Sequence, residues 1–77
     1  MKLPSKERLA QIRADYPPGT RVVLEYMDDA FAPPVDTHGT VIAVDDLGDL
    51  IMQWDNGSGL NVCLDVDRVR KEDDSVG

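Results

Sequence analysis

The sequence of 77 residues contains one cysteine, one histidine and only four aromatic side chains. The single cysteine, Cys63, excludes an intramolecular disulfide, and with His38 as the only histidine a zinc site of four Cys or His ligands is excluded too. No apolar run approaches the roughly 20 residues that a membrane-spanning helix needs, and the first residues do not resemble a signal peptide. We therefore expect a protein of the reducing cytoplasm with no membrane contact.

Basic residues are also scarce, because 8 Lys and Arg oppose 15 Asp and Glu for a net charge of −7. Residues 1–15 carry a net charge of +2, so residues 16–77 carry −9. A field of that sign repels phosphate backbones and attracts basic partners, so direct nucleic-acid binding is not expected. Acidic charge also serves solubility alone, and the sequence leaves both roles open.

The segment 39–57 organises the rest of the chain, because alternation of apolar and polar residues runs through it twice. Residues 40–44 and 50–55 alternate, and residues 45–49 between them are rich in Asp and Gly. Asn56-Gly57 then supplies a pair that tolerates positive φ at both centres of a type I′ turn. This segment predicts the central hairpin of a small β-barrel.

The residues before the hairpin predict a short helix. Ser5 is a typical N-cap, the helix would span Lys6–Asp15, and Pro17-Pro18 would end it. A helix of about ten residues is marginal in water, so we expect it to dock on the barrel. The alternative is a basic arm that meets a partner. Its narrow apolar stripe consists of Leu9, Ile12 and Tyr16.

Further alternation predicts strands at residues 20–27, 58–64 and 68–71, for a total of five. We divide the chain into a helix (1–16), a barrel (17–71) and a charged tail (72–77) that we expect to be disordered. Both faces of residues 40–44 are apolar, so a slip of one residue would turn Thr40, Ile42 and Val44 inward. The predicted core otherwise consists of Val22, Leu24, Val41, Ala43, Leu50, Met52, Leu60, Val62 and Val69.

Residues 28–38 form an unusually long loop with two adjacent prolines, and such loops tend to be functional or mobile. Phe31 either folds back over an open end of the barrel or lies exposed beside Pro33-Pro34. Trp54 likewise either caps the core or stands partly exposed near this loop. Aromatic side chains carry much of the binding energy at interfaces. We therefore predict partner binding by Tyr26, Asp28, Asp29, Phe31 and Trp54.

No pattern in the sequence indicates an enzyme. Adjacent aspartates such as Asp28-Asp29 and Asp45-Asp46 are what turns select, and no serine lies in a Gly-x-Ser-x-Gly context. Residues 45–49 are too short for a calcium-binding loop of twelve residues. We therefore expect no catalytic residue, no metal and no cofactor.

Four short motifs point to a known family: Gly-Thr-Arg-Val at 19–22, Gly-Thr-Val at 39–41, Trp-Asp-Asn-Gly at 54–57 and Asp-Arg-Val-Arg at 67–70. The chain resembles, over nearly its whole length, a family of uncharacterised small domains carried by phages and conjugative elements of Gram-positive bacteria. More distantly, it is similar to SH3-like barrels of the mind-bomb type, which are protein-interaction modules. The resemblance implies a mainly β, SH3-like, five-stranded barrel with the N-terminal helix docked on it, and no particular ligand.

Two functions follow from these observations. In the first, the chain is a non-enzymatic adaptor, encoded by a mobile element, that holds a protein partner against its aromatic residues. In the second, it is an acidic inhibitor that mimics nucleic acid and binds a basic host or element protein. Either way we expect a partner of unknown identity with a basic surface, and a chain that is monomeric or weakly dimeric.

Overall fold

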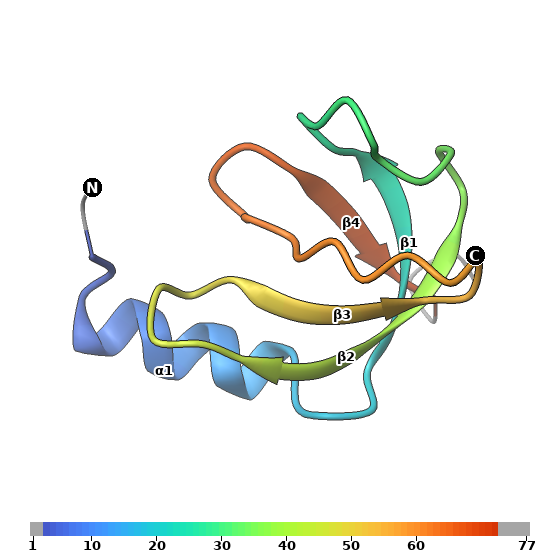
Figure 1. Ribbon diagram of the computed structural model, residues 1–77. Helices are drawn as coiled ribbons and strands as arrows, with labels where there is room; N and C mark the ends of the chain where they lie inside the picture. Colours follow the sequence, from blue (N-terminus) through green and yellow to red (C-terminus); the bar gives the residue numbers. More distant parts are fainter. Residues whose placement is uncertain (1–2, 73–77) are drawn as a thin grey trace.

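The computed structural model describes residues 3–72 and contains one helix and four strands there. In chain order these are α1 (Lys6–Asp15), β1 (Arg21–Tyr26), β2 (His38–Val44), β3 (Leu50–Trp54) and β4 (Arg68–Lys71). The strands form one antiparallel sheet in the order β3-β2-β1-β4, with α1 alongside β2 (Figure 1). The predicted mainly β domain with one helix is confirmed.

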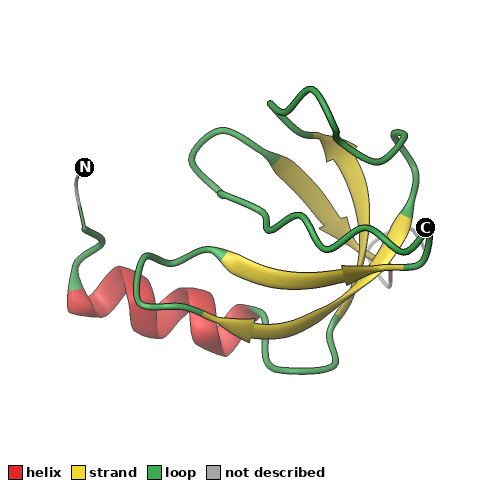
Figure 2. Cartoon of the chain, in the orientation of Figure 1, coloured by secondary structure: helices red, strands yellow, loops and turns green. Residues whose placement is uncertain are grey.

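The sheet does not close into the predicted barrel, because the edge strands β3 and β4 form no ladder within residues 3–72. The segment between β3 and β4, drawn as a loop in Figure 2, includes residues 58–64, which were predicted to form a strand. It forms only one isolated β-bridge, to β3. In that bridge Leu50 and Val62 exchange N–H···O bonds of 2.9 and 3.0 Å. The Asn61 side chain then accepts the N–H of Met52 at 3.3 Å. A bridge and a side chain thus cap the edge of β3 where a strand was expected.

A β-bulge in β2 explains the one predicted core position that is exposed, Ala43. Val41 pairs with Met52 and Ala43 with Ile51, so β2 contains an extra residue between these pairs. The extra residue reverses the alternation of faces beyond Val41. Ala43 therefore faces solvent, whereas Val44 packs partly buried against the core. Of the alternative in which Thr40, Ile42 and Val44 turn inward, only the part after the bulge, at Val44, is observed.

The core otherwise contains the predicted residues and four that the core prediction omitted, namely Ile12, Val23, Met27 and Trp54. Leu60 and Val69 pack against it half-buried, and the remaining predicted positions are buried. Met27 and Trp54 join the same cluster. Val23, which alternation assigned to the outer face of β1, is buried as well, although it lies outside that cluster. The long side chain of its cross-strand partner Arg70 lies on that face, and such stems often cover apolar residues.

Helix α1 has the predicted bounds and docks as predicted. The Ser5 hydroxyl accepts the N–H of Arg8 at 3.0 Å, which satisfies a free N–H of the first turn. Ile12 is buried against the sheet and Tyr16 is half-buried beside it. At the other end, the Arg13 guanidinium donates to the Val44 carbonyl at 3.3 Å and pairs with Asp46 at 2.9 Å. The helix is therefore part of the folded domain.

The turn after β3 differs from the predicted type I′ turn. Gly57 has φ of 92°, but Asn56 does not have positive φ. Gly57 donates its N–H to the Trp54 carbonyl at 3.0 Å, and Trp54 donates to Ser58 at 2.9 Å. The loop therefore contains three residues with one left-handed glycine. The Asn56 side chain instead accepts the N–H of Ser58 at 3.0 Å.

Candidate functional site

The loop between β1 and β2, residues 27–37, is held in place at both ends. At its start, the backbone N–H of Asp28 donates to the carboxylate of Asp67 at 2.9 Å. At its end, Asp36 donates to the carbonyl of Leu24 at 2.8 Å, and Leu24 donates to Thr37 at 2.9 Å. Two residues of the loop itself, Met27 and Pro33, are buried. The loop therefore has a defined conformation despite its length and lies at the other side of the sheet from α1 (Figure 1).

Phe31 stands out on this loop because 85% of it is exposed. Its backbone N–H donates to the Asp29 carboxylate at 2.7 Å, and Ala32 donates to the Asp29 carbonyl at 3.1 Å. These two bonds make an Asx-type turn that fixes the backbone carrying the aromatic ring. Of the two alternatives for Phe31, the structure has the exposed one.

Three of the other predicted residues share this region. Tyr26, at the end of β1, is 53% exposed, and both Asp28 and Asp29 are exposed. Val35, which sequence reasoning missed, adds a further apolar side chain that is 61% exposed. A β-branched residue directly after two prolines in a polar loop was the signal for it. We call Tyr26, Asp28, Asp29, Phe31 and Val35 the loop surface.

Trp54 does not belong to the loop surface, which corrects its predicted role. It is 1% exposed, and its indole N–H donates to the Leu60 carbonyl at 2.8 Å. Its ring packs on Gly39, the cross-strand partner, where an added Cβ would lie 2.5 Å from the ring. Glycine at this position makes room for the indole. Trp54 is a core residue with no surface to offer a partner.

A cluster of charged side chains surrounds Arg21 of β1. It connects β1 with β2, with the turn after β3 and with Glu72 after β4. The Arg21 guanidinium donates two bonds to Asp55, of 2.7 and 2.6 Å, one to Thr40 and one to Glu72 at 3.2 Å. Glu72 also accepts a contact of 2.6 Å from Nδ1 of His38. Glu72 is therefore part of the folded domain, although the sequence assigned it to the tail. Residues 73–77 of that predicted tail lie outside the described residues.

The cluster neutralises its own carboxylates. Hydrogen bonding from Arg21 holds the pKa of Asp55 below its ordinary value. Hydrogen bonding from His38, with the charge of Arg21, does the same for the pKa of Glu72. Hydrogen bonding to Asp55 in turn raises the pKa of Arg21. Each charge has a partner here, which is the arrangement expected of a structural ion-pair network rather than a reactive site.

A family model described as "Domain of unknown function (DUF4314)" matches residues 5–72. The chain belongs to this family. The matched part of this DUF4314 domain begins at Ser5, the N-cap of α1, and ends at Glu72, which pairs with Arg21. The helix and the Arg21 cluster thus both lie within the family's domain. No curated protein and no solved structure matches the chain.

The described part of the DUF4314 domain contains neither a metal-binding group of side chains nor a membrane-spanning helix. Within residues 3–72, no three His, Cys, Asp or Glu side chains are grouped so that they could hold a metal ion. The same residues include no helix of the length and apolar character required to cross a bilayer. We take the loop surface as the candidate site, because it contains four of the five predicted binding residues and all four are exposed.

Proposed function

We propose that this DUF4314 domain is a non-enzymatic protein-interaction module that holds a partner against the loop surface. The observation that supports it is Phe31, a large apolar side chain 85% exposed on a hydrogen-bonded turn. Aromatic residues, phenylalanine included, are enriched at protein interfaces relative to the rest of the surface. Because the loop is already held by Asp67 and Leu24, little conformational entropy is lost when a partner binds.

The charges of the loop surface favour a partner with a basic rim around an apolar contact. Asp28 forms no ion pair within the described residues, and Asp29 uses one carboxylate oxygen to accept from Phe31. Both aspartates are exposed and lie within three residues of Phe31 in the sequence. Rim charges of this kind mainly raise the association rate and select among partners.

The alternative, an acidic inhibitor that mimics nucleic acid, has weaker support. Such a mimic needs carboxylates spaced over one face like phosphates. Here many of the carboxylates are committed to local structure: Asp46 pairs with Arg13, Asp55 with Arg21, and Asp45 and Asp67 accept backbone N–H groups. Among residues 3–72, the carboxylates with no ion pair and no backbone N–H to accept lie on different elements: α1, the loop, the turn before β3 and the turn before β4. They are Glu7, Asp15, Asp28, Asp49 and Asp65.

Affinity capture with variants separates the two functions. The immobilised domain, Phe31→Ala and the matched control Ile42→Ala, an exposed apolar residue of β2, would be incubated with lysate of the native host. The adaptor function predicts a protein that the wild type and the Ile42 variant retain and the Phe31 variant loses, with little change between about 50 and 500 mM salt. The inhibitor function predicts release by salt and by the double change Asp28→Lys with Asp29→Lys. Capture that survives every change would contradict both.

The setting of this function is part of the proposal. The four motifs shared with domains of phages and conjugative elements support an origin in a mobile element. The strand order, with the chain from β3 to β4 running between the edges of the sheet, supports a relationship to SH3-like barrels. A lone cysteine supports a reducing cytoplasm as the place of action.

A further inference from the structure

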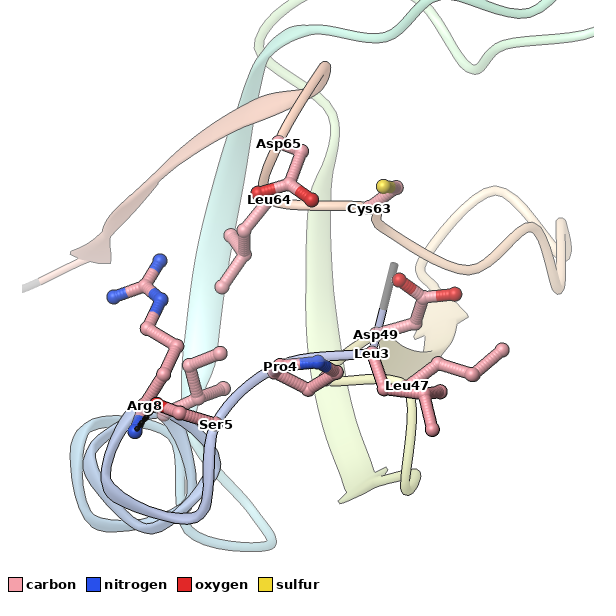
Figure 3. Close-up of a pocket in the computed structure, with 11 residues that line it drawn as sticks. Leu3, Pro4, Ser5, Arg8, Leu47, Asp49, Cys63, Leu64 and Asp65 are labelled. Atoms are coloured by element: carbon pink, nitrogen blue, oxygen red, sulfur yellow. Dashed lines mark hydrogen bonds between the residues drawn. The ribbon is translucent and has the colours of Figure 1, made fainter. Parts of the chain in front are cut away.

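A groove of about 380 Å³ separates α1 from two other segments and shares no residue with the loop surface (Figure 3). One wall is the start of α1, the second is the turn between β2 and β3, and the third is the chain from Cys63 to Asp65. Apolar side chains from all three walls line it: Leu3, Pro4, Ile12, Leu47 and Leu64. Two carboxylates, Asp49 and Asp65, line it as well.

The walls of the groove are fixed by hydrogen bonds and close packing. In the turn, the Asp45 carboxylate accepts the N–H groups of Leu47 and Asp49 at 3.0 and 2.9 Å. Gly48 sits so close to the helix that an added Cβ would lie 3.2 Å from Cδ1 of Ile12. In the third wall, Asp67 accepts the N–H of Cys63 at 2.9 Å. The groove therefore exists before any ligand arrives.

The two carboxylates that line the groove differ from the two that hold its walls. Those of Asp45 and Asp67 are occupied by backbone N–H groups, whereas Asp49 and Asp65 accept no backbone N–H and form no ion pair within the described residues. Burial and the negative charge of Asp45 raise the pKa of Asp49, against a hydrogen bond from Cys63. The groove thus contains negative charge that the domain does not neutralise.

Among residues 3–72, Arg8 is the only cationic side chain that lines the groove, and it does not neutralise the negative charge there. Figure 3 shows Arg8 on the helix side, separated from Asp49 on the turn side. Arg8 forms no ion pair among residues 3–72, and no cation contributes to the shift of Asp49. A ligand with a positive end would meet an unoccupied counter-charge here.

We propose that the groove binds a lysine or arginine side chain of a basic partner segment. Its methylene stem would lie against Leu47 and Leu64, and its cationic end would be hydrogen-bonded by Asp49 and Asp65. Long basic side chains combine an apolar stem with a charged end in this way, and hydrogen bonds between opposite charges are the strong ones. An apolar side chain would leave the Asp49 charge desolvated, and an anion would be repelled by it.

The test needs no partner, because N-acetyl-arginine amide can serve as the probe. Its titration into the ¹⁵N-labelled full chain is expected to shift the amide signals of Gly48 and Leu64. N-acetyl-norleucine amide, which has a similar stem and no charge, is expected to shift them at least about tenfold less at equal concentration. Asp49→Asn should weaken arginine binding about tenfold, whereas Asp46→Asn, on the same turn but outside the groove, should not.

The stability of the Asp49 variant separates a binding role from a structural one. Because the folded state raises the pKa of Asp49, Asp49→Asn should melt at a higher temperature while it loses probe binding. Equal binding of the norleucine amide, unchanged binding by Asp49→Asn, or tighter binding of N-acetyl-glutamate amide at Arg8 would each overturn the proposal. Because the loop surface is intact in every variant, none of these results bears on the proposed function.

Discussion

The turns before and after β3 have the same backbone hydrogen bonds but different charged neighbours. Residues 45–49 before the strand and 54–58 after it each close with a bond from the first N–H to the fifth carbonyl, of 3.0 and 2.9 Å. In each, the fourth residue is a glycine with φ of 83° or 92° that donates to the first carbonyl at 3.0 Å. The backbone plan is therefore the same, so differences between the turns reflect their surroundings.

The surroundings differ in charge. Asp55, in the turn after β3, receives two hydrogen bonds from Arg21, which lower its pKa. Asp49, at the end of the turn before β3, has its pKa raised by burial and by Asp45. The two aspartates are the second and the fifth residue of their turns, and the neighbouring cations decide whether each charge is satisfied. An abundance of turn carboxylates thus says little about function until the cations are placed.

The largest expected loss of stability comes from Ile12, which packs on the turn before β3. Ile12→Ala removes the buried side chain that packs on Gly48, and should lower the free energy of unfolding by about 2–4 kcal/mol. Denaturant unfolding measures this loss. Amide hydrogen exchange should accelerate more at Gly48 than at Gly57. Equal acceleration at both would show that the helix does not support its turn selectively.

Gly48→Ala and Gly57→Ala compare the two turns further, because both substitutions place alanine at a similar positive φ. Each places a side chain at positive φ, which costs about 1–2 kcal/mol. At Gly57 no atom lies within 4 Å of the added Cβ, whereas at Gly48 it would meet Ile12. Gly48→Ala should therefore be less stable than Gly57→Ala by about 1 kcal/mol or more, measured by denaturant unfolding. The reverse order would contradict the close packing of the helix on the turn.

The helix and four of the five predicted strands were predictable because their signals are local, whereas the strand predicted at residues 58–64 forms only one bridge. Ser5, the prolines at 17 and 18 and the alternation of β3 each act within a few residues, and the structure follows them. The bulge that exposes Ala43 was not predictable, because it depends on pairing between β2 and β3. Trp54 was ambiguous for the same reason: the space for its ring comes from Gly39 on another strand.

The candidate sites were predictable only in part. A loop of this length with an aromatic residue and two prolines pointed to the loop surface, and Phe31 is exposed there. The groove could not be foreseen, because its walls come from three segments that only the fold brings together. The difference between Asp49 and Asp55 was equally hidden, since Arg21 reaches Asp55 from 34 positions away in the sequence.

Neutralising each carboxylate in turn should move stability in opposite directions. Asp49→Asn removes an unfavourable charge and should raise the melting temperature at pH 7. Asp55→Asn removes the partner of Arg21 and should lower it. Thermal unfolding followed by circular dichroism measures both. A fall for Asp49→Asn would mean that its carboxylate has a favourable partner in the fold.

The smallest expected effect is on the pH dependence of stability, where the two ends of β3 again oppose each other. The lowered pKa values of Asp55 and Glu72 give stability that is present above their ordinary values of 3.8 and 4.5 and is lost as the pH falls through the folded values. Asp49 has the opposite sign, because its raised pKa makes the folded state less stable as the pH rises from 3.8.

The melting temperature of the wild type should therefore rise slightly as the pH is lowered from 7 toward the ordinary values, and then fall below them. Asp49→Asn should abolish the rise and keep the fall, since Asp55 and Glu72 are unchanged. Asp55→Asn should keep the rise and weaken the fall. Melting curves at closely spaced pH values and constant ionic strength test this. If Asp49→Asn and the wild type have parallel profiles, Asp49 is neutralised by a cation, and the contrast between the two turns does not hold.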